Sequence, residues 1–157
     1  MKAFVTVILV FIFILNVKSQ DYKEDEQEIY NLYTKMFDAM IDKDWDQYQS
    51  FWIHDTTLRV LHPSIRDWGE GWEAFKVQIK PYFDPDFSMN AELKINRFDV
   101  NIAPGGDFAW AIFEISVISN GHESQAWQVS VYRKVENEWK LNLALDAHLP
   151  PMNGSDK

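Results

Sequence analysis

The sequence contains no cysteine. This absence excludes disulfide scaffolds, metal sites built on thiolates, cysteine nucleophiles and the lipid anchor of a lipoprotein. Basic residues are also scarce, because 15 Lys and Arg stand against 24 Asp and Glu and give a net charge of −9. Binding a phosphate backbone needs clustered basic residues, so we expect no nucleic-acid partner.

Large hydrophobic side chains are abundant. Hydrophobic residues make up 46% of the chain and aromatic residues 15%, which is too much for a disordered protein. A length of 157 residues is too short for a (β/α)8 barrel enzyme and suits one domain with a short extension. We therefore expect one small, acidic and well-packed globular domain.

The first residues have the pattern of a secretory signal. Lys2 precedes an almost entirely apolar run, Ala3 to Leu15, and residues 16–20 are mostly polar. A membrane span needs about 20 apolar residues, so this run is too short for a stable anchor. We predict that residues 1–19 are a signal peptide and that the product is secreted or periplasmic, with no membrane partner after cleavage. Its removal would change the net charge from −9 to −11.

The part before residue 88 has the patterns of three helices and a strand. Apolar residues recur at spacings of three and four over 29–41, which predicts an amphipathic helix. Asp44 is a suitable N-cap for a short second helix. Alternating residues over 56–62 predict a strand, and a third helix is expected to begin at Trp72 after a glycine-containing break.

From residue 88 the hydrophobic period changes to two. Four long antiparallel strands are predicted, with a bulge near Arg97. The turn signals are Pro104–Asp107, Asn120-Gly121 and Glu136–Glu138. Residues 150–157 are expected to be a flexible tail. They contain Asn153-Gly154-Ser155, a glycosylation sequon in form.

Three segments together resemble a known superfamily. They are Lys43-Asp44-Trp45-Asp46, Glu70 to Phe75, and the hairpin Val131 to Leu141. Over residues 25–149 the chain resembles the nuclear transport factor 2-like superfamily, most closely its SnoaL-like small-domain branch. The resemblance implies an α+β, cystatin-like fold, in which a cone-shaped curved antiparallel sheet is wrapped by three N-terminal helices around a pocket. Members of this superfamily are often homodimers through the outer face of the sheet, so the resemblance also implies a homodimer. Members of the superfamily include isomerases, dehydratases and non-enzymatic domains, so the fold does not choose a function.

Alternation along the last strand selects candidate acid/base residues. If the period of two holds throughout, one face carries Lys140, Asn142, Ala144, Asp146 and His148, and the other carries Trp139, Leu141, Leu143 and Leu145. Asp146 would then orient His148 as a general base or acid, or both would ligate a metal ion. A solvated strand end is the structural alternative. His54 is a candidate donor to a substrate oxygen or a third metal ligand, or else a loop histidine.

Aromatic residues are the candidates for a ligand pocket. The expected set is Trp52, Trp72, Trp110, Trp127 and Tyr132. The alternative is that they are core and dimer-interface residues. The sequence has no G-x-S-x-G, P-loop, H-E-x-x-H or dinucleotide motif, so we expect no cofactor.

Two functions follow from these patterns. The first is binding of a small, mainly apolar molecule, which leaves room for cofactor-free isomerisation or dehydration with His148, Asp146 and either His54 or Tyr132 as oxyanion donor. The second is a non-catalytic homodimeric interaction module whose rings fill the interior. An open cavity would favour the first function. A filled interior would favour the second.

Overall fold

The computed structural model describes residues 22–61, 70–87, 89–119 and 121–148. The predicted signal peptide (1–19) and tail (150–157) lie outside these ranges. The elements in chain order are α2 (Lys23–Ile41), α3 (Trp45–Ser50), β1 (Arg59–Leu61), α4 (Trp72–Ile79), the 3-10 helix η1 (Lys80–Phe83), β2 (Ala91–Ile102), β3 (Phe108–Ser119), β4 (His122–Val135) and β5 (Glu138–His148). None of the helices in these ranges is long and apolar enough to cross a membrane.

The helices form where their local signals predict. The buried residues of α2 lie on its predicted apolar face: Ile29, Leu32, Tyr33, Met36 and Ala39. The side chain of Asp44 accepts a hydrogen bond of 2.9 Å from the backbone N–H of Gln47 and so caps α3. Gly71 precedes α4 with φ 85° and ψ 174°, a conformation that essentially only glycine adopts.

The four long strands are antiparallel and form one sheet with β1. The strand order is β1-β5-β4-β3-β2, and the short β1 pairs in parallel with β5. The predicted bulge near Arg97 is confirmed by a register shift between Ile95 and Arg97. Glu136 and Asn137 adopt φ values of 51° and 68°, which allow the tight turn between β4 and β5.

A second bulge corrects the prediction for the last strand. Val131 pairs with Leu143 and Tyr132 pairs with Leu141, so Asn142 is an extra residue in β5. Trp139 and Leu141 are consequently buried on the same side as Ala144, whereas Leu145 is 36% exposed. The single alternation expected from residue 139 to 148 is therefore wrong, because the two halves of the strand bury residues of opposite parity.

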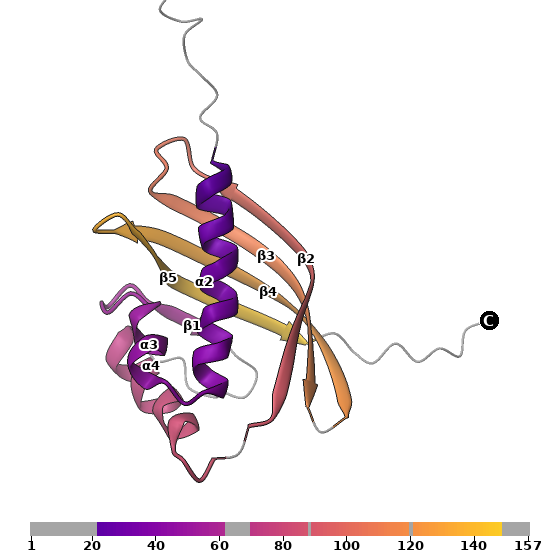
Figure 1. Cartoon of the computed structure of the whole chain (residues 1–157). Coiled ribbons are helices and arrows are strands. Elements are labelled where there is room, and N and C mark those ends of the chain that lie inside the picture. Colours follow the sequence, from indigo (N-terminus) through magenta and orange to yellow (C-terminus); the bar gives the residue numbers. More distant parts are fainter. Residues whose placement is uncertain (1–21, 62–69, 88, 120, 149–157) are drawn as a thin grey trace, which may run out of the picture.

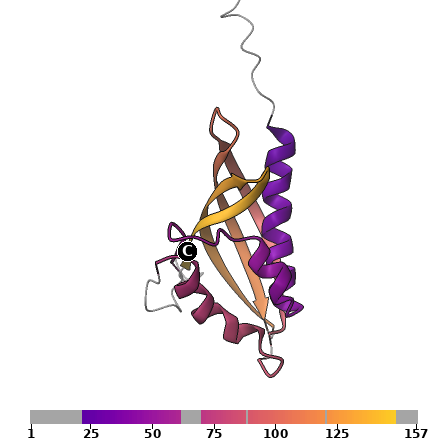
Figure 2. The same ribbon diagram turned by 90° about the vertical axis from the view of Figure 1, so that its left-hand side faces the viewer.

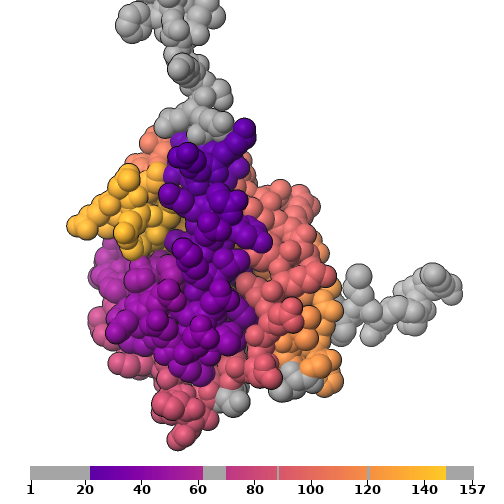
Figure 3. Space-filling model, viewed as in Figure 1, coloured from indigo at the N-terminus to yellow at the C-terminus, as the bar shows by residue number. Residues whose placement is uncertain are grey.

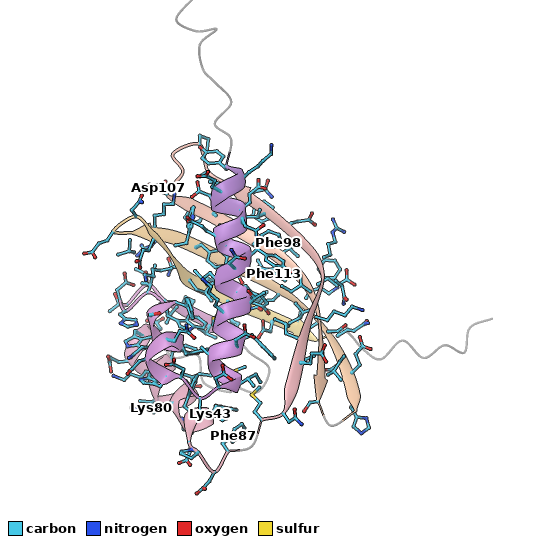
Figure 4. All side chains as sticks on the ribbon, in the orientation of Figure 1. Lys43, Lys80, Phe87, Phe98, Asp107 and Phe113 are labelled. Atoms are coloured by element: carbon cyan, nitrogen blue, oxygen red, sulfur yellow. The ribbon has the colours of Figure 1, made fainter. Side chains whose placement is uncertain are left out.

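The helices cover one face of a curved sheet, which confirms the α+β fold class. Figure 1 shows α2 lying along the sheet, and Figure 2 shows the sheet curving with α4 near its lower end. In Figure 3, α2 crosses this face of the molecule between β2 and α3. The ring of Tyr33 stacks on Phe113 at 4.1 Å, and Phe98 lies 4.9 Å from Phe113 beneath the helix (Figure 4). The core is thus a layer of rings between α2 and the sheet.

The N-terminal end of α2 is fixed by polar contacts. The indole N–H of Trp139 donates a hydrogen bond of 2.9 Å to the Asp25 carboxylate. The ammonium nitrogen of Lys134 lies 2.5 Å from the same carboxylate and 4.9 Å from the centre of the Trp139 ring. The Tyr22 hydroxyl donates to the Pro104 carbonyl at 2.9 Å. These contacts join the start of the helix to two turns of the sheet.

Candidate functional site

A cavity of about 340 Å³ lies between the helices and the inner face of the sheet. Its lining comes from almost every element and is mainly apolar. The lining residues are Tyr33, Met36, Phe37, Met40, Tyr48, Trp52, Val60, Phe75, Ile79, Tyr82, Met89, Ile115, Val117, Ser124, Ala126, Gln128, Ala144 and Asp146. A volume of this size is within the range of small-molecule pockets. The interior is therefore not filled by its aromatic rings.

Helix spacing and small sheet residues create this space. Tyr33, Met36, Phe37 and Met40 are three or four residues apart, so the C-terminal half of α2 forms one wall. The sheet contributes two alanines, Ala126 of β4 and Ala144 of β5. Larger residues at these two positions would occupy the cavity.

Among the described lining residues, Asp146 is the only one with a carboxyl group. It lies in β5 opposite Gln128 of β4. Removal from water by its mainly apolar surroundings raises the pKa of the Asp146 carboxyl to about 6. Burial raises the pKa of Tyr33 well above its usual range, and the charge of Asp146 raises it further. The carboxyl can thus gain or lose a proton near neutral pH.

Two further polar groups come from α3 and the turn after it. Burial is also the main cause that raises the pKa of Tyr48, and Asp146 adds to it. The nearby indole N–H of Trp52 lowers the pKa of the Tyr48 hydroxyl. This N–H forms no hydrogen bond of ordinary geometry with any described residue. Trp52 is 5% exposed and lines the cavity, so its N–H is a donor that a bound molecule can use.

Two lysines lie close to the cavity without lining it. Lys43 donates a hydrogen bond of 2.6 Å to the backbone carbonyl of Tyr82 and lies 4.7 Å from the centre of the Phe87 ring (Figure 4). Lys80 lies 5.4 Å from the centre of the Trp45 ring. Because Tyr82 lines the cavity, the contact from Lys43 fixes part of its wall.

Of the five aromatic residues expected to bind a ligand, only Trp52 lines the cavity. Trp72 is buried beside it and stacks on His54, and Tyr132 is fully buried in the core. Trp110, 42% exposed, and Trp127 lie on the outer face of the sheet, since the inner residues of β3 and β4 have the opposite parity. Alternation alone does not say which apolar face turns inward.

The three residues expected to carry acid/base chemistry are not all brought together. The exposed side chain of His54 stacks on Trp72 at 4.0 Å, and its Nε2 lies 2.8 Å from the Gln49 carbonyl oxygen. It does not line the cavity with Asp146. His148 ends β5 opposite Ala126, but its side chain lies outside the described part of the chain. No group of three potential metal ligands occurs among the described residues.

Sequence reasoning did not select Tyr33 and Tyr48 as site residues. Both occupy buried positions on helices, so the periodicity assigns them to the core. The available signal is their residue type. A phenol at a core-facing helix position carries a hydroxyl that needs a polar partner, which points to a cavity or a buried network.

The fold and the lining can now be compared with known proteins. A family model described as a SnoaL-like domain matches residues 29–143. The chain belongs to the SnoaL-like domain family. The sequence has no match among the curated proteins. The family assignment agrees with the resemblance drawn from the sequence.

Solved structures of the nuclear transport factor 2-like fold are similar to this SnoaL-like domain. One, described as a candidate dehydratase of the family from Streptomyces avermitilis, has a TM-score of 0.69 and 15% identity, covering 83% of this chain and 99% of that one. The association domain of CaMKII from C. elegans has a TM-score of 0.65 and 20% identity, and the match covers 80% of this chain and 96% of that one. A candidate ketosteroid isomerase from Parabacteroides distasonis has a TM-score of 0.62 and 20% identity, and the match covers 80% of this chain and 88% of that one. At these identities the likeness extends to the fold alone.

Proposed function

We propose that this SnoaL-like domain binds a small, mainly apolar molecule in its cavity, with the polar part of that molecule against Asp146. One observation carries the proposal: a cavity of about 340 Å³ has a mainly apolar lining, and the described lining residues include one carboxyl group, that of Asp146. Apolar surfaces provide affinity, and one buried polar group fixes orientation.

The same groups suit cofactor-free proton transfer, such as an isomerisation or a dehydration. A carboxyl whose pKa is about 6 can act as a general base or acid near neutral pH. The phenols of Tyr33 and Tyr48 stay protonated there and can donate hydrogen bonds to a developing oxyanion. In this scheme Asp146 takes the proton-transfer role expected for His148.

Filling the cavity tests the proposal. Ala126→Phe places a ring in the space, whereas Ala147→Phe adds the same ring at an exposed position of β5. A library of small apolar compounds is screened by thermal shift and by quenching of tryptophan fluorescence. We expect ligands that bind the wild type and the Ala147→Phe variant but not the Ala126→Phe variant. If the same ligands bind the filled variant equally well, the cavity is not the binding site.

A second function, assembly into a homodimer, has its own observation. Two neighbouring cross-strand rows on the outer face of the sheet are apolar. We call the six residues the outer patch: Trp110, Val131 and Leu143 in one row, and Ile112, Val129 and Leu145 in the other. Trp110 is 42% and Leu145 36% exposed. Contiguous apolar surface of this kind marks interaction sites, and one structure similar to this domain is an association domain.

Light scattering after size exclusion tests the dimer. Trp110→Lys places a charge in the outer patch, and Val77→Lys places one at another exposed apolar residue, on α4. We expect a dimer for the wild type and for Val77→Lys, and a monomer for Trp110→Lys. A monomeric wild type would contradict the proposal. A dimer leaves the cavity free, so the two functions are compatible.

Export is a further part of the proposal. The apolar run from Ala3 to Leu15 supports cleavage after Ser19. Mass spectrometry of protein recovered outside the producing cells, or from the periplasm, should find a chain that begins at Gln20. Retention of the full chain inside the cell would contradict this.

A further inference from the structure

We infer that the molecule bound in the cavity is neutral and carries a carboxamide or lactam group, which pairs with the side-chain amide of Gln128. The inference rests on the proposed function and adds the chemical class of the ligand. It also assigns a residue that recognises the polar part of the ligand.

The position of Gln128 in the fold is the first argument. Its neighbours on the inner face of β4 are Ala126 and Ser130, which are both small. In the adjacent strands it lies opposite Phe113 of β3 and Asp146 of β5. The Gln128 side chain lines the cavity and is only 6% exposed. A long polar side chain therefore extends from the inner face of the sheet into a mainly apolar space.

The hydrogen-bonding capacity of this side chain is the second argument. A glutamine amide has two N–H donors and an oxygen with two acceptor sites. Within the described part of the chain, the Gln128 side chain forms no hydrogen bond, although it is more than nine-tenths buried. The ring of Phe113, on one side of it, has no hydrogen-bonding group. Buried polar groups in proteins nearly always have a partner, so an amide that lines a cavity indicates a partner inside the cavity.

The chemistry of the Gln128 amide selects the ligand class. Its N–H donor and its oxygen lie side by side on one planar group, so a partner that meets both must present an acceptor beside a donor. A carboxamide or a lactam does so, because its C=O can accept from Nε2–H while its N–H donates to Oε1. A ketone or an ester has no donor. A carboxylate also has no donor, and it would lose its hydration in a mainly apolar cavity.

The remaining lining defines the body of the ligand. The wall from α2 includes Met36, Phe37 and Met40, and β3 contributes Ile115 and Val117, all of which are apolar. A cavity of about 340 Å³ with such walls suits an arylalkyl body. We therefore expect a ligand with an apolar body and an amide at one end.

Three probes of nearly the same shape separate the ligand classes: 4-phenylbutanamide, the methyl ketone 5-phenylpentan-2-one, and 4-phenylbutanoate. The ketone has CH₃ where the carboxamide has NH₂, so it keeps the acceptor and loses the donor. Dissociation constants are measured by calorimetry at pH 7.5 for the wild type and for Gln128→Met, which removes both hydrogen-bonding groups and keeps a side chain of similar length. Gln125→Met is the matched control, because it makes the same change at an exposed position of the same strand. The filled variant Ala126→Phe reports whether binding occurs in the cavity.

For the wild type we expect the carboxamide to bind about tenfold tighter than the ketone, and the carboxylate to bind weakest. Gln128→Met should remove the preference for the carboxamide, whereas Gln125→Met should keep it. The comparison of carboxamide with ketone on the wild type needs no variant, so it tests the inference even if Gln128→Met does not fold.

Two kinds of failure are distinguishable. If the wild type binds the ketone as tightly as the carboxamide, or if Gln128→Met keeps the preference, the inference is overturned. The proposed function still stands in that case when the filled variant loses binding. If no probe binds, or if the filled variant binds all probes equally well, both are overturned.

Discussion

Replacing Asp146 by asparagine should stabilise the protein at neutral pH. The substitution keeps the shape of the side chain and removes a charge that the cavity holds away from water. Removal from water raises the pKa of this carboxyl from 3.8 to about 6 in the folded protein. The folded state therefore holds a proton that the unfolded state releases. As the pH rises from about 4 to about 6, ionisation of Asp146 increasingly favours the unfolded state. Above pH 6 this destabilisation of the folded protein is complete.

The size of the effect follows from the two pKa values. A difference of this size corresponds to at most about 3 kcal/mol at 1.36 kcal/mol per pH unit. The carboxyl is only partly buried, and asparagine keeps part of the cost of removing a polar group from water. We therefore expect Asp146→Asn to add about 1–2 kcal/mol to the free energy of unfolding at pH 7.5, and almost nothing at pH 4.

Urea unfolding at pH 4.0, 5.5 and 7.5 measures this difference. Glu123→Gln is the matched control, because it removes one negative charge from an exposed position of the neighbouring strand. Its free energy of unfolding should differ little from that of the wild type at all three values. A variant of Asp146 that is destabilised at pH 7.5, or whose effect does not change with pH, would refute the reasoning.

Two further pairs of substitutions test the packing by urea unfolding. Gly71→Ala should cost about 2 kcal/mol or more, because the new Cβ would lie 3.0 Å from the Cα of Thr56, in the turn before β1, and because Gly71 has a conformation that only glycine favours. Gly121→Ala also has positive φ but meets nothing within 4 Å, so about 1 kcal/mol is expected, and equal costs would contradict this account. Asp25→Ala should cost about 1–2 kcal/mol by leaving the Trp139 indole without its acceptor, whereas exposed Glu24→Ala should change little. Equal small effects at both acids would contradict that contact.

Local signals predicted much of the fold. The spacing of apolar residues in α2, the side-chain cap from Asp44 and the bulge near Arg97 all depend on neighbours in the chain. Such features are readable from sequence because each is decided within a few residues.

The site was less predictable, because it depends on contacts between distant segments. The bulge at Asn142 reverses which residues of β5 are buried, and nothing in the local pattern marks it. Trp52 and Trp110 are the same residue type, yet one lines the cavity and the other lies on the outer face. Which face of the sheet receives the helices is settled only by tertiary packing. Asp146 was among the residues selected from the sequence and lines the cavity, but its surroundings come from α2 and α3.

The anchoring of Tyr22 to Pro104 has a practical consequence for biophysical work. It places the start of α2 at the turn between β2 and β3, and the first cavity residue of that helix, Tyr33, is about 15 Å further along the axis. The other end of the described chain, His148, is only two residues beyond Asp146. A fluorophore or an immobilisation tag attached before Tyr22 should leave the cavity accessible, whereas one attached close after His148 would stand beside it.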